Sequence, residues 1–216
     1  MTRPLPFAVL ISGRGSNMLA LARAAATGAI GGRVSMVVSD RADAGGLGAA
    51  AALGLDTQVV ERHAGEERAA YGRRLHEAVA ASGAECIALA GFKRILDGEF
   101  VRRWEGRLLN IHPSLLPAWR GLNTHERVLE AGDRCHGCTV HFVTEELDAG
   151  PAVIQGRLAV LPGEDAAGLS ARVQRLEHII YPRAVGWLAA GRLSWRDGAP
   201  RLDGRLLREA VIEEAA

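Results

Sequence analysis

The chain has 216 residues, 48% of them hydrophobic and 24% charged, which is enough apolar material for a substantial core. Its 26 basic and 25 acidic residues nearly cancel, so its charge gives no reason to expect a nucleic acid or a membrane surface as a partner. The odd, sparse set of Cys86, Cys135 and Cys138 argues against a disulfide framework and indicates a reducing compartment. There is no secretory signal and no run of about 20 apolar residues, so we expect a cytoplasmic protein.

Short apolar runs alternate with longer stretches of helical spacing through the first 145 residues. The predicted strands are Phe7–Ile11, Val34–Val38, Thr57–Val60, Cys86–Ala90, Leu108–Ile111 and Thr139–Thr144. The predicted helices are Asn17–Thr27, Gly45–Leu53, Glu66–Ala81, Asp97–Trp104 and Thr124–Glu130. This alternation predicts an α/β fold with a Rossmann-like, mostly parallel sheet and helices on both faces. No repeat, linker or shift in composition divides the chain, so residues 1–216 are expected to form a single domain.

The last part of the chain predicts a long helix and a hairpin. Apolar residues recur at helical spacing over Glu164–Ala190, although Pro182 falls inside this stretch and should end or kink the helix. Asp197-Gly198 is typical of a tight hairpin turn.

A glycine-rich loop follows the first predicted strand and opens the first predicted helix. In Ser12-Gly13-Arg14-Gly15-Ser16-Asn17, the amides of Gly15, Ser16 and Asn17 would point out of the helix N-terminus, where the helix dipole favours an anion. Ser16 can also cap the helix. The spacing fits neither a dinucleotide-binding fingerprint, because Met18 replaces the third glycine, nor a Walker loop. Both a phosphate-binding loop and a plain strand-to-helix turn fit this segment.

Two polar side chains end the predicted strand Leu108–Ile111. Because strand side chains alternate, Asn110 and His112 share one face, and Pro113 keeps His112 extended. An amide donor beside an imidazole is suited to polarising a carbonyl group. On its own, this pattern is more often a hydrogen-bonded core histidine with a strand-end asparagine.

Asp148 lies in a Gly-Pro turn that follows the strand Thr139–Thr144. If that strand lies parallel beside the strand of His112, the two strand ends are neighbours and Asp148 can reach the imidazole. Taken alone, Asp148 is better explained as a turn-forming residue. The non-periodic stretch Pro113–Asn123 is expected to be a ligand-binding loop at the same sheet edge.

The cysteine-rich stretch Cys135-His136-Gly137-Cys138 superficially suggests a metal site with His141. Only two cysteines are nearby, and Cys138 and His141 are three residues apart in an alternating strand, so they fall on opposite faces. We therefore expect no metal site, and with no activating partner in view we expect no nucleophilic cysteine.

Taken together, these segments resemble the folate-dependent formyltransferases nearly from end to end. The resemblance rests on Leu10–Asn17, Leu89–Leu96, Gly106–Pro117, Val140–Thr144, Glu146–Asp148 and Glu177–Pro182. Its most specific element is the run Asn-Ile-His-Pro-Ser-Leu-Leu-Pro from Asn110 to Pro117. The resemblance implies transfer of the formyl group of 10-formyltetrahydrofolate to the amine of glycinamide ribonucleotide, a step of purine biosynthesis. It also implies small-molecule substrates, no metal, and a monomer or homodimer.

The same resemblance implies roles for individual residues. The catalytic set would be Asn110, His112 and Asp148. The ribonucleotide would be held by Gly15, Ser16 and Asn17 at its phosphate, and by Gln174 and Glu177 at its sugar and glycinamide part. The folate would contact Arg68, Lys93, Arg94, Ile95, Leu96, Asn110 and Thr144. The sequence departs from the family at three positions. Lys93 replaces a common Met, Asn123 stands where some relatives have His, and Ala149 replaces a Gly.

Other functions remain as alternatives to this implied transferase. A formyltetrahydrofolate hydrolase is expected to carry an extra N-terminal regulatory domain, whereas this pattern starts at Phe7. A methionyl-tRNA formyltransferase would need a C-terminal tRNA-binding domain and a basic surface. A non-catalytic nucleotide-binding regulator would use the glycine-rich loop but has no need for Asn110, His112 and Asp148 together.

Overall fold

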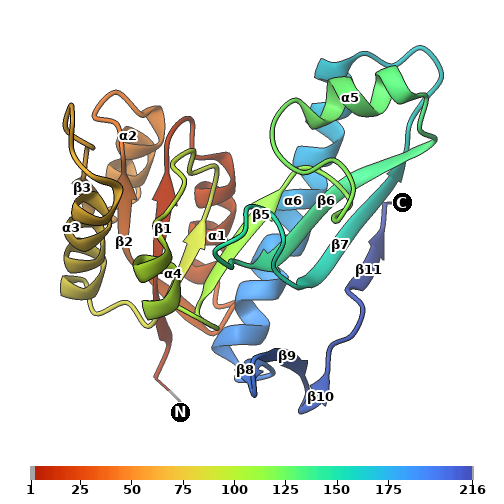
Figure 1. The fold of residues 1–216 in the computed structure, drawn as a ribbon. Coiled ribbons are helices and arrows are strands. Elements are labelled where there is room, and N and C mark those ends of the chain that lie inside the picture. The colour runs from red at the N-terminus through yellow and green to blue at the C-terminus, as the bar shows by residue number, and fades with distance from the viewer. Residues whose placement is uncertain (1–2, 216) are drawn as a thin grey trace.

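The computed structural model describes residues 3–215, which are arranged around an eight-stranded sheet of order β11-β7-β6-β5-β4-β1-β2-β3 (Figure 1). Its strands are β1 (Leu5–Ile11), β2 (Gly32–Ser39), β3 (Thr57–Val59), β4 (Cys86–Leu89), β5 (Leu108–His112), β6 (Cys135–Phe142), β7 (Ala152–Ala159) and β11 (Val211–Glu214). The helices are α1 (Ser16–Ala26), α2 (Gly45–Ala52), α3 (Arg68–Ala81), α4 (Gly98–Arg103), α5 (Thr124–Ala131) and α6 (Ala166–Ala189).

The sheet is mostly parallel, as the alternation of elements predicts. The pairs β1–β2, β2–β3, β1–β4, β4–β5 and β7–β11 are parallel. In contrast, β6 runs antiparallel to both β5 and β7. Strands β7 and β11 are not predicted from the sequence. Polar residues and Gly156 interrupt the apolar run of β7, and β11 is short and half exposed.

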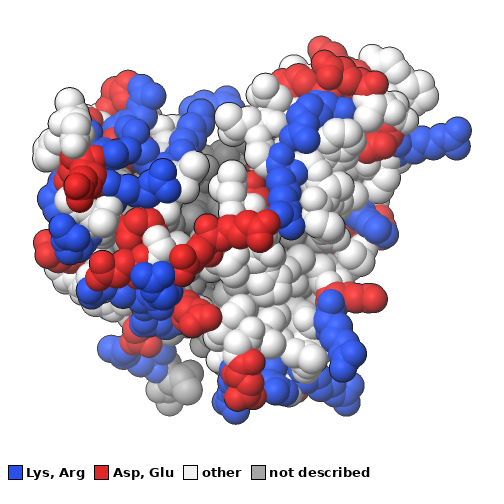
Figure 2. Space-filling model, viewed as in Figure 1, with Lys and Arg blue, Asp and Glu red and all other residues white. Residues whose placement is uncertain are grey.

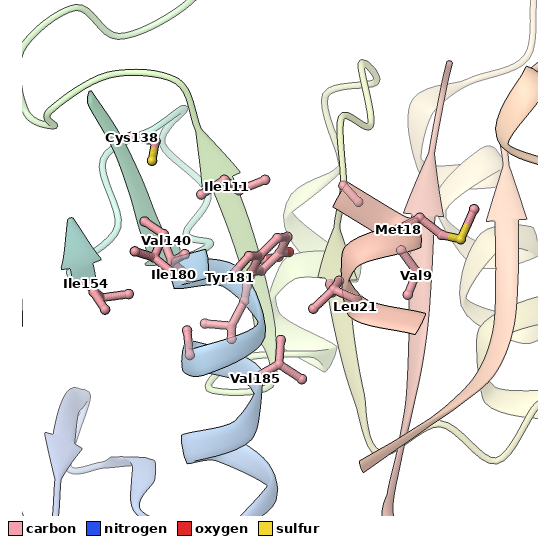
Figure 3. Close-up of a cluster of buried hydrophobic side chains, with 14 of the residues drawn as sticks. Val9, Met18, Leu21, Ile111, Cys138, Val140, Ile154, Ile180, Tyr181 and Val185 are labelled. Atoms are coloured by element: carbon pink, nitrogen blue, oxygen red, sulfur yellow. The ribbon is translucent and has the colours of Figure 1, made fainter. Parts of the chain in front are cut away.

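Helices cover both faces of the sheet, which confirms the predicted layers. On one face, α1, α2 and α6 pack against apolar side chains of β1, β5 and β6, together with Val128 of α5. On the other face, α3 and α4 bury the alternate residues of β1 and β4. Figure 3 shows the first of these cores, where Tyr181 and Val185 of α6 lie between Ile111 of the sheet and Leu21 of α1.

The long helix α6 runs through the position of Pro182 and continues to Ala189. Pro182 therefore does not end the helix, which was one of the two outcomes predicted for it. Buried residues on both sides of the proline, including Ile180 and Val185, pack into the core and hold the helix across it. The hydroxyl of Tyr181 also donates to the carbonyl oxygens of Leu89 (3.0 Å) and Leu109 (3.1 Å), which ties α6 to the sheet.

A second, three-stranded antiparallel sheet follows α6 and consists of β8 (Leu193–Arg196), β9 (Ala199–Leu202) and β10 (Arg205–Leu206). The predicted hairpin at Asp197-Gly198 is confirmed, since it joins β8 to β9 with φ angles of 55° and 72°. Asp203-Gly204 forms a matching turn with φ angles of 51° and 77° between β9 and β10. None of the helices in residues 3–215 has the length and apolar character of a membrane span.

The face of the sheet that α3 and α4 cover is polar over β5, β6 and β7. Asn110, His112, Thr139, His141 and Gln155 alternate there with apolar residues that point to the opposite core. Backbone segments cover this polar face where no helix does, since residues 113–123 and the β6–β7 turn lie over it. This arrangement shelters the polar side chains at the end of β5, a region that is called the polar cleft below.

Candidate active site

Strand β5 brings Asn110 and His112 to one face, as the alternation predicts. Their neighbours Leu109 and Ile111 point into the core beneath α6. His112 is buried and Asn110 is half-buried. The amide and the imidazole therefore stand side by side in the polar cleft.

The structure also brings Asp148 to His112. The Nδ1 atom of His112 lies 3.5 Å from Oδ2 of Asp148, and the side chain of each residue is 8% exposed. The expected route through a neighbouring parallel strand is wrong, because β6 is antiparallel and pairs Phe142 with Leu109 at the far end of β5. Asp148 reaches His112 because the β6–β7 turn folds back over the sheet.

That fold-back depends on the backbone of the turn. Gly150 is so close to the sheet that an added Cβ would lie 1.8 Å from the carbonyl oxygen of Phe142. Asp148 itself has a φ of 50°, a left-handed conformation that aspartate tolerates better than most residues. The turn therefore requires glycine at position 150 and favours a short polar residue at position 148.

His141 completes the cluster and was not predicted as a functional residue. Its Nδ1 lies 2.9 Å from the carbonyl oxygen of Phe142, and its Nε2 lies 3.1 Å from Nδ2 of Asn110 and 3.9 Å from Asp148. Burial lowers the pKa of His141 to about 4, so the ring is neutral at pH 7. Because a carbonyl can only accept, the ring proton is on Nδ1 and the bare Nε2 accepts from the amide of Asn110.

The loop of residues 113–123 closes over these groups through its backbone. The carbonyl oxygen of Trp119 lies 3.1 Å from Nε2 of His112, and the amide of Gly121 donates to Oδ2 of Asp148 at 3.1 Å. Thr139 and Gln155 anchor the base of the loop by hydrogen bonds to its main chain. The pattern of polar residues alternating along β6 and β7 is the signal that would have found these anchors.

The glycine-rich loop between β1 and α1 has the geometry of an anion site. Gly15 occupies the position before the helix with a φ of 76°, and an added Cβ would lie 3.0 Å from Cα of Gly46. The first helical hydrogen bond runs from the amide of Leu19 to the carbonyl of Gly15, so the amides of Ser16 and Asn17 precede the bonded part of the helix. The expected capping role of Ser16 is wrong, because Ser16 is the first helical residue and no side chain caps this end.

The glycine-rich loop is linked to α6 by a buried hydrogen bond. Nδ2 of Asn17 donates to Oε2 of Glu177 at 2.7 Å, and burial raises the pKa of the Glu177 carboxyl. The Oδ1 atom of Asn17 is buried and has no partner in the described part of the chain. Gln174 lies one turn earlier on α6 and is half-buried. The predicted ribonucleotide residues thus gather between α1 and α6.

The predicted folate residues are brought together only in part. Arg68, Lys93, Arg94 and Ile95 line one cavity of about 220 Å³. Leu96 packs instead against the core under α3 and α4. The Thr144 hydroxyl donates to the carbonyl of Glu146 at 3.3 Å, inside the turn that carries Asp148.

Two further residues line that cavity and were missed. Arg62 precedes α3 and Tyr71 lies in its first turn, so Tyr71 follows Arg68 by three positions on one helix face. The helical spacing was the available signal for Tyr71. Arg62 lies in a loop, where no periodic pattern marks it.

The cysteine-rich stretch is divided between the two faces of the sheet. Cys138 lies in the core beneath α6, and burial raises the pKa of its thiol. His141 points to the opposite face, as the alternation predicts. His136 pairs with His125 of α5 at 3.0 Å between Nε2 and Nδ1, and burial lowers the pKa of His136 to about 4.

Comparisons with known proteins agree with this arrangement. Over 199 residues the chain is 47% identical to the phosphoribosylglycinamide formyltransferase of Escherichia coli (strain K12), covering 92% of this chain and 94% of that protein. It is 43% identical over 184 residues to the trifunctional purine biosynthetic protein adenosine-3 of Bos taurus, covering 85% of this chain and 18% of that protein. The solved structure of the phosphoribosylglycinamide formyltransferase of Coxiella burnetii matches with a TM-score of 0.91 at 43% identity, over 96% of this chain and 99% of that one.

The family model described as formyl transferase matches residues 5–185, a range that contains the whole of the polar cleft and the glycine-rich loop. This chain belongs to the formyl transferase family.

Proposed function

We propose that the protein transfers the formyl group of 10-formyltetrahydrofolate to the amine of glycinamide ribonucleotide, giving formylglycinamide ribonucleotide and tetrahydrofolate. The observation that carries the proposal is the convergence of Asn110, His112 and Asp148 in one sheltered cleft of a formyl transferase. The names of the similar relatives support this acceptor. Residues 1–216 act as one domain, and the three free cysteines support a cytoplasmic setting.

The acceptor occupies the space between the glycine-rich loop and α6. The amides of Gly15, Ser16 and Asn17 hold its phosphate at the positive end of α1. Its sugar and glycinamide part lie against Gln174 and Glu177, and the unpartnered Oδ1 of Asn17 is available there to a hydroxyl or amide proton. This subsite holds the amine at a fixed distance from the cleft.

The folate carrier lies between the polar cleft and the cavity of about 220 Å³ beside α3, which is called the cationic cavity because Arg62, Arg68, Lys93 and Arg94 line it. Lys93, Arg94 and Ile95 follow β4 and border the carrier, while Arg68 contacts its outer end. Leu96 packs against the core behind them. Thr144 lies in the turn before Asp148 and borders the inner end, where Asn110 meets the formyl group. Holding both substrates in alignment lowers the entropic part of the barrier.

The reaction needs no nucleophile from the protein. An α-amine has a pKa of about 8, so a useful fraction is neutral near pH 7 and attacks the formyl carbon directly. The formyl oxygen then gains negative charge, the new C–N bond forms, and the bond from carbon to N10 breaks as N10 takes a proton. The protein must stabilise that oxygen and move a proton from the attacking amine toward N10.

Asn110 and His112 supply the stabilising donors. The amide of Asn110 gives one hydrogen to His141 and keeps the second for the oxyanion. Nε2 of His112 now faces the carbonyl oxygen of Trp119, and the oxyanion competes for that same hydrogen. A positioned donor of this kind is worth about 10²–10³ in rate.

Asp148 serves as the proton acceptor and orients the ring. Its Oδ2 faces Nδ1 of His112, so a protonated ring has an acceptor on each side, Asp148 and the Trp119 carbonyl. The carboxylate takes the proton released by the amine, directly or through water, and passes it toward N10.

Mixing the purified protein with 10-formyltetrahydrofolate, with and without glycinamide ribonucleotide, tests the proposal through the loss of the formyl-folate spectrum. We expect fast loss only when the acceptor is present. Equal loss without the acceptor would make the protein a hydrolase. No loss in either mixture would contradict the transferase and favour a binding protein.

A further inference from the structure

The glycine-rich loop and the segment of residues 91–96, which is called the post-β4 segment here, leave the sheet at neighbouring strand ends. Strands β1 and β4 are parallel neighbours, and the amide of Ala90 donates to the carbonyl oxygen of Leu10 at 2.8 Å where they end. Beyond this bond Ser12 begins the glycine-rich loop, while Gly91 turns the post-β4 segment away with a φ of 77°. Main-chain pairing between the two strands therefore stops just before both proposed substrate subsites.

The two segments continue to opposite faces of the sheet. The glycine-rich loop leads into α1, which packs on the face that α6 covers, whereas the post-β4 segment leads into α4, which packs on the other face beside α3. A crevice forms outside the carboxyl ends of neighbouring strands whose connections leave in opposite directions, and the order β4-β1-β2 places that point between β1 and β4. The proposed acceptor subsite thus lies on the side of α1 and α6. The proposed carrier subsite lies on the side of α3, where Figure 2 shows Lys and Arg side chains gathered at the upper left of the visible face.

Ser12 joins the two segments across this crevice. Its Oγ accepts a hydrogen bond from the amide of Lys93 at 2.8 Å, and Ser12 is only 5% exposed. Within the part of the chain that the structure describes, this is the only hydrogen bond between residues 12–17 and 91–96. Because a single side-chain torsion places the serine oxygen, the bond holds the two main chains at a closely defined distance.

The other contacts of the two segments hold each one against its own surroundings. On the glycine-rich loop, the carbonyl oxygen of Gly13 accepts from an amide of α2 at 3.0 Å, and Asn17 donates to a carboxylate of α6. On the post-β4 segment, Nε of Arg94 donates to Oδ2 of the buried Asp40 at 2.7 Å. None of these bonds runs from one segment to the other, so the position of one segment relative to the other depends on Ser12.

We propose that Ser12 is a positioning residue that aligns the acceptor subsite with the carrier subsite, so that the attacking amine meets the formyl carbon. The proposal rests on the proposed function, since it assumes a ribonucleotide at the glycine-rich loop and a folate carrier at the post-β4 segment. Direct transfer makes this alignment important, because reacting atoms must approach within about 3–3.5 Å and a misplacement of about 1 Å can cost about a hundredfold in rate.

Loss of the bond lets the two segments shift relative to each other, while each keeps its remaining contacts and its own substrate. It should therefore slow the transfer step more than it weakens the binding of either substrate.

The test separates alignment from binding in Ser12→Ala. Dissociation constants for tetrahydrofolate and for glycinamide ribonucleotide are measured separately by calorimetry, and the rate of formyl transfer is measured in a single turnover with both substrates saturating. Ser12→Cys is measured in parallel, because it keeps a side chain of similar shape with a weaker acceptor. Ser35→Ala is the matched control, since it also removes one buried serine hydroxyl, here from a 3.1 Å contact with the hydroxyl of Ser82.

In Ser12→Ala we expect the single-turnover rate to fall about tenfold to a hundredfold, while each dissociation constant stays within about twofold of the wild-type value. The rate of Ser12→Cys should lie between those of the wild type and Ser12→Ala. Ser35→Ala should keep the wild-type rate and both wild-type dissociation constants.

A wild-type transfer rate in Ser12→Ala would overturn the proposal, even if both dissociation constants rose, because Ser12 would then serve binding and not alignment. If Ser12→Ala does not fold, a wild-type rate in Ser12→Cys would overturn it in the same way. An equal fall in rate in Ser35→Ala would also overturn it, since any buried hydroxyl would then have the same effect. Each of these results, with transfer intact in the wild type, would leave the proposed transferase standing. Absence of transfer in the wild type would contradict the proposed function itself.

Discussion

Asn110 and His141 face each other directly across the antiparallel pair β5–β6, with 3.1 Å between Nδ2 of the amide and Nε2 of the ring. Burial lowers the pKa of His141 to about 4, so the ring is neutral and carries one N–H. That N–H, at Nδ1, donates to the carbonyl oxygen of Phe142. The ring is therefore a fixed acceptor that orients the amide of Asn110. The donor proposed for the oxyanion thus depends on a histidine that does not itself need to change its protonation state.

Replacing His141 should misplace that donor. His141→Ala is expected to lower kcat about tenfold to a hundredfold, with a smaller effect on the KM for the carrier, because one positioned donor is worth about 10²–10³ in rate. His141→Gln places an acceptor oxygen near the former Nε2 and should recover part of kcat. A folded His141→Ala protein with wild-type kcat would refute this orienting role.

The buried histidines make stability depend on pH. Burial lowers the pKa of His136 to about 4, below the ordinary value of about 6.5, so the unfolded chain binds the proton more readily. Stability is therefore full above about pH 6.5 and is lost as the pH falls toward 4. Between pH 7 and pH 5, His136 alone should remove about 2 kcal/mol of unfolding free energy.

Urea unfolding at pH 7, 6 and 5 checks this effect against His136→Gln, which keeps an acceptor or donor for His125 and removes the titrating ring. The variant should show a visibly smaller loss over this range. Parallel pH curves for the two proteins would mean that His136 is not the source of the dependence. Limiting the range to pH 5 and above keeps most carboxyl groups ionised.

The glycine-rich loop depends on its close contact with α2. An added Cβ at Gly46 would lie 2.6 Å from Cδ1 of Ile11 and 3.0 Å from the carbonyl of Gly13, whereas a Cβ at Gly48 meets nothing within 4 Å. Gly46→Ala should therefore displace the loop and raise the KM for the ribonucleotide about tenfold or more. Gly48→Ala should leave that KM unchanged and stabilise the helix by up to about 1 kcal/mol.

Steady-state kinetics with the ribonucleotide as the varied substrate distinguishes the two alanines. If both variants keep the wild-type KM for this substrate, the loop does not hold the acceptor's phosphate. A rise in the carrier KM alone in Gly46→Ala would equally speak against the assignment.

Much of the fold follows from periodicity, because β1 to β5 and their helices form βαβ units with strong apolar patterns. The antiparallel direction of β6 could not be predicted in this way, since the direction of a strand depends on the connection that leads to it and not on the strand's own residues. The placement of Asn110 and His112 on one face was predictable from the alternation of side chains along one strand. The route of Asp148 was not, because it depends on the close approach of Gly150 to Phe142.

Local signals also failed where tertiary contacts override them. Pro182 disfavours a helix locally, yet Tyr181 and its neighbours hold α6 in the core. Ser16 is a good capping residue, but Gly15 takes the left-handed position before the helix. Arg62 enters the cationic cavity from a loop, so only the folded chain reveals it.

The roles of His112 and Asp148 are decided by the turnover of His112→Ala and Asp148→Asn, measured together with the binding of the folate carrier to each variant. We expect both variants to lose most of their kcat, by about a hundredfold or more, and still to bind the carrier, because the proposed roles are to stabilise the oxyanion and to move the proton. Turnover close to that of the wild type in both variants would contradict these roles.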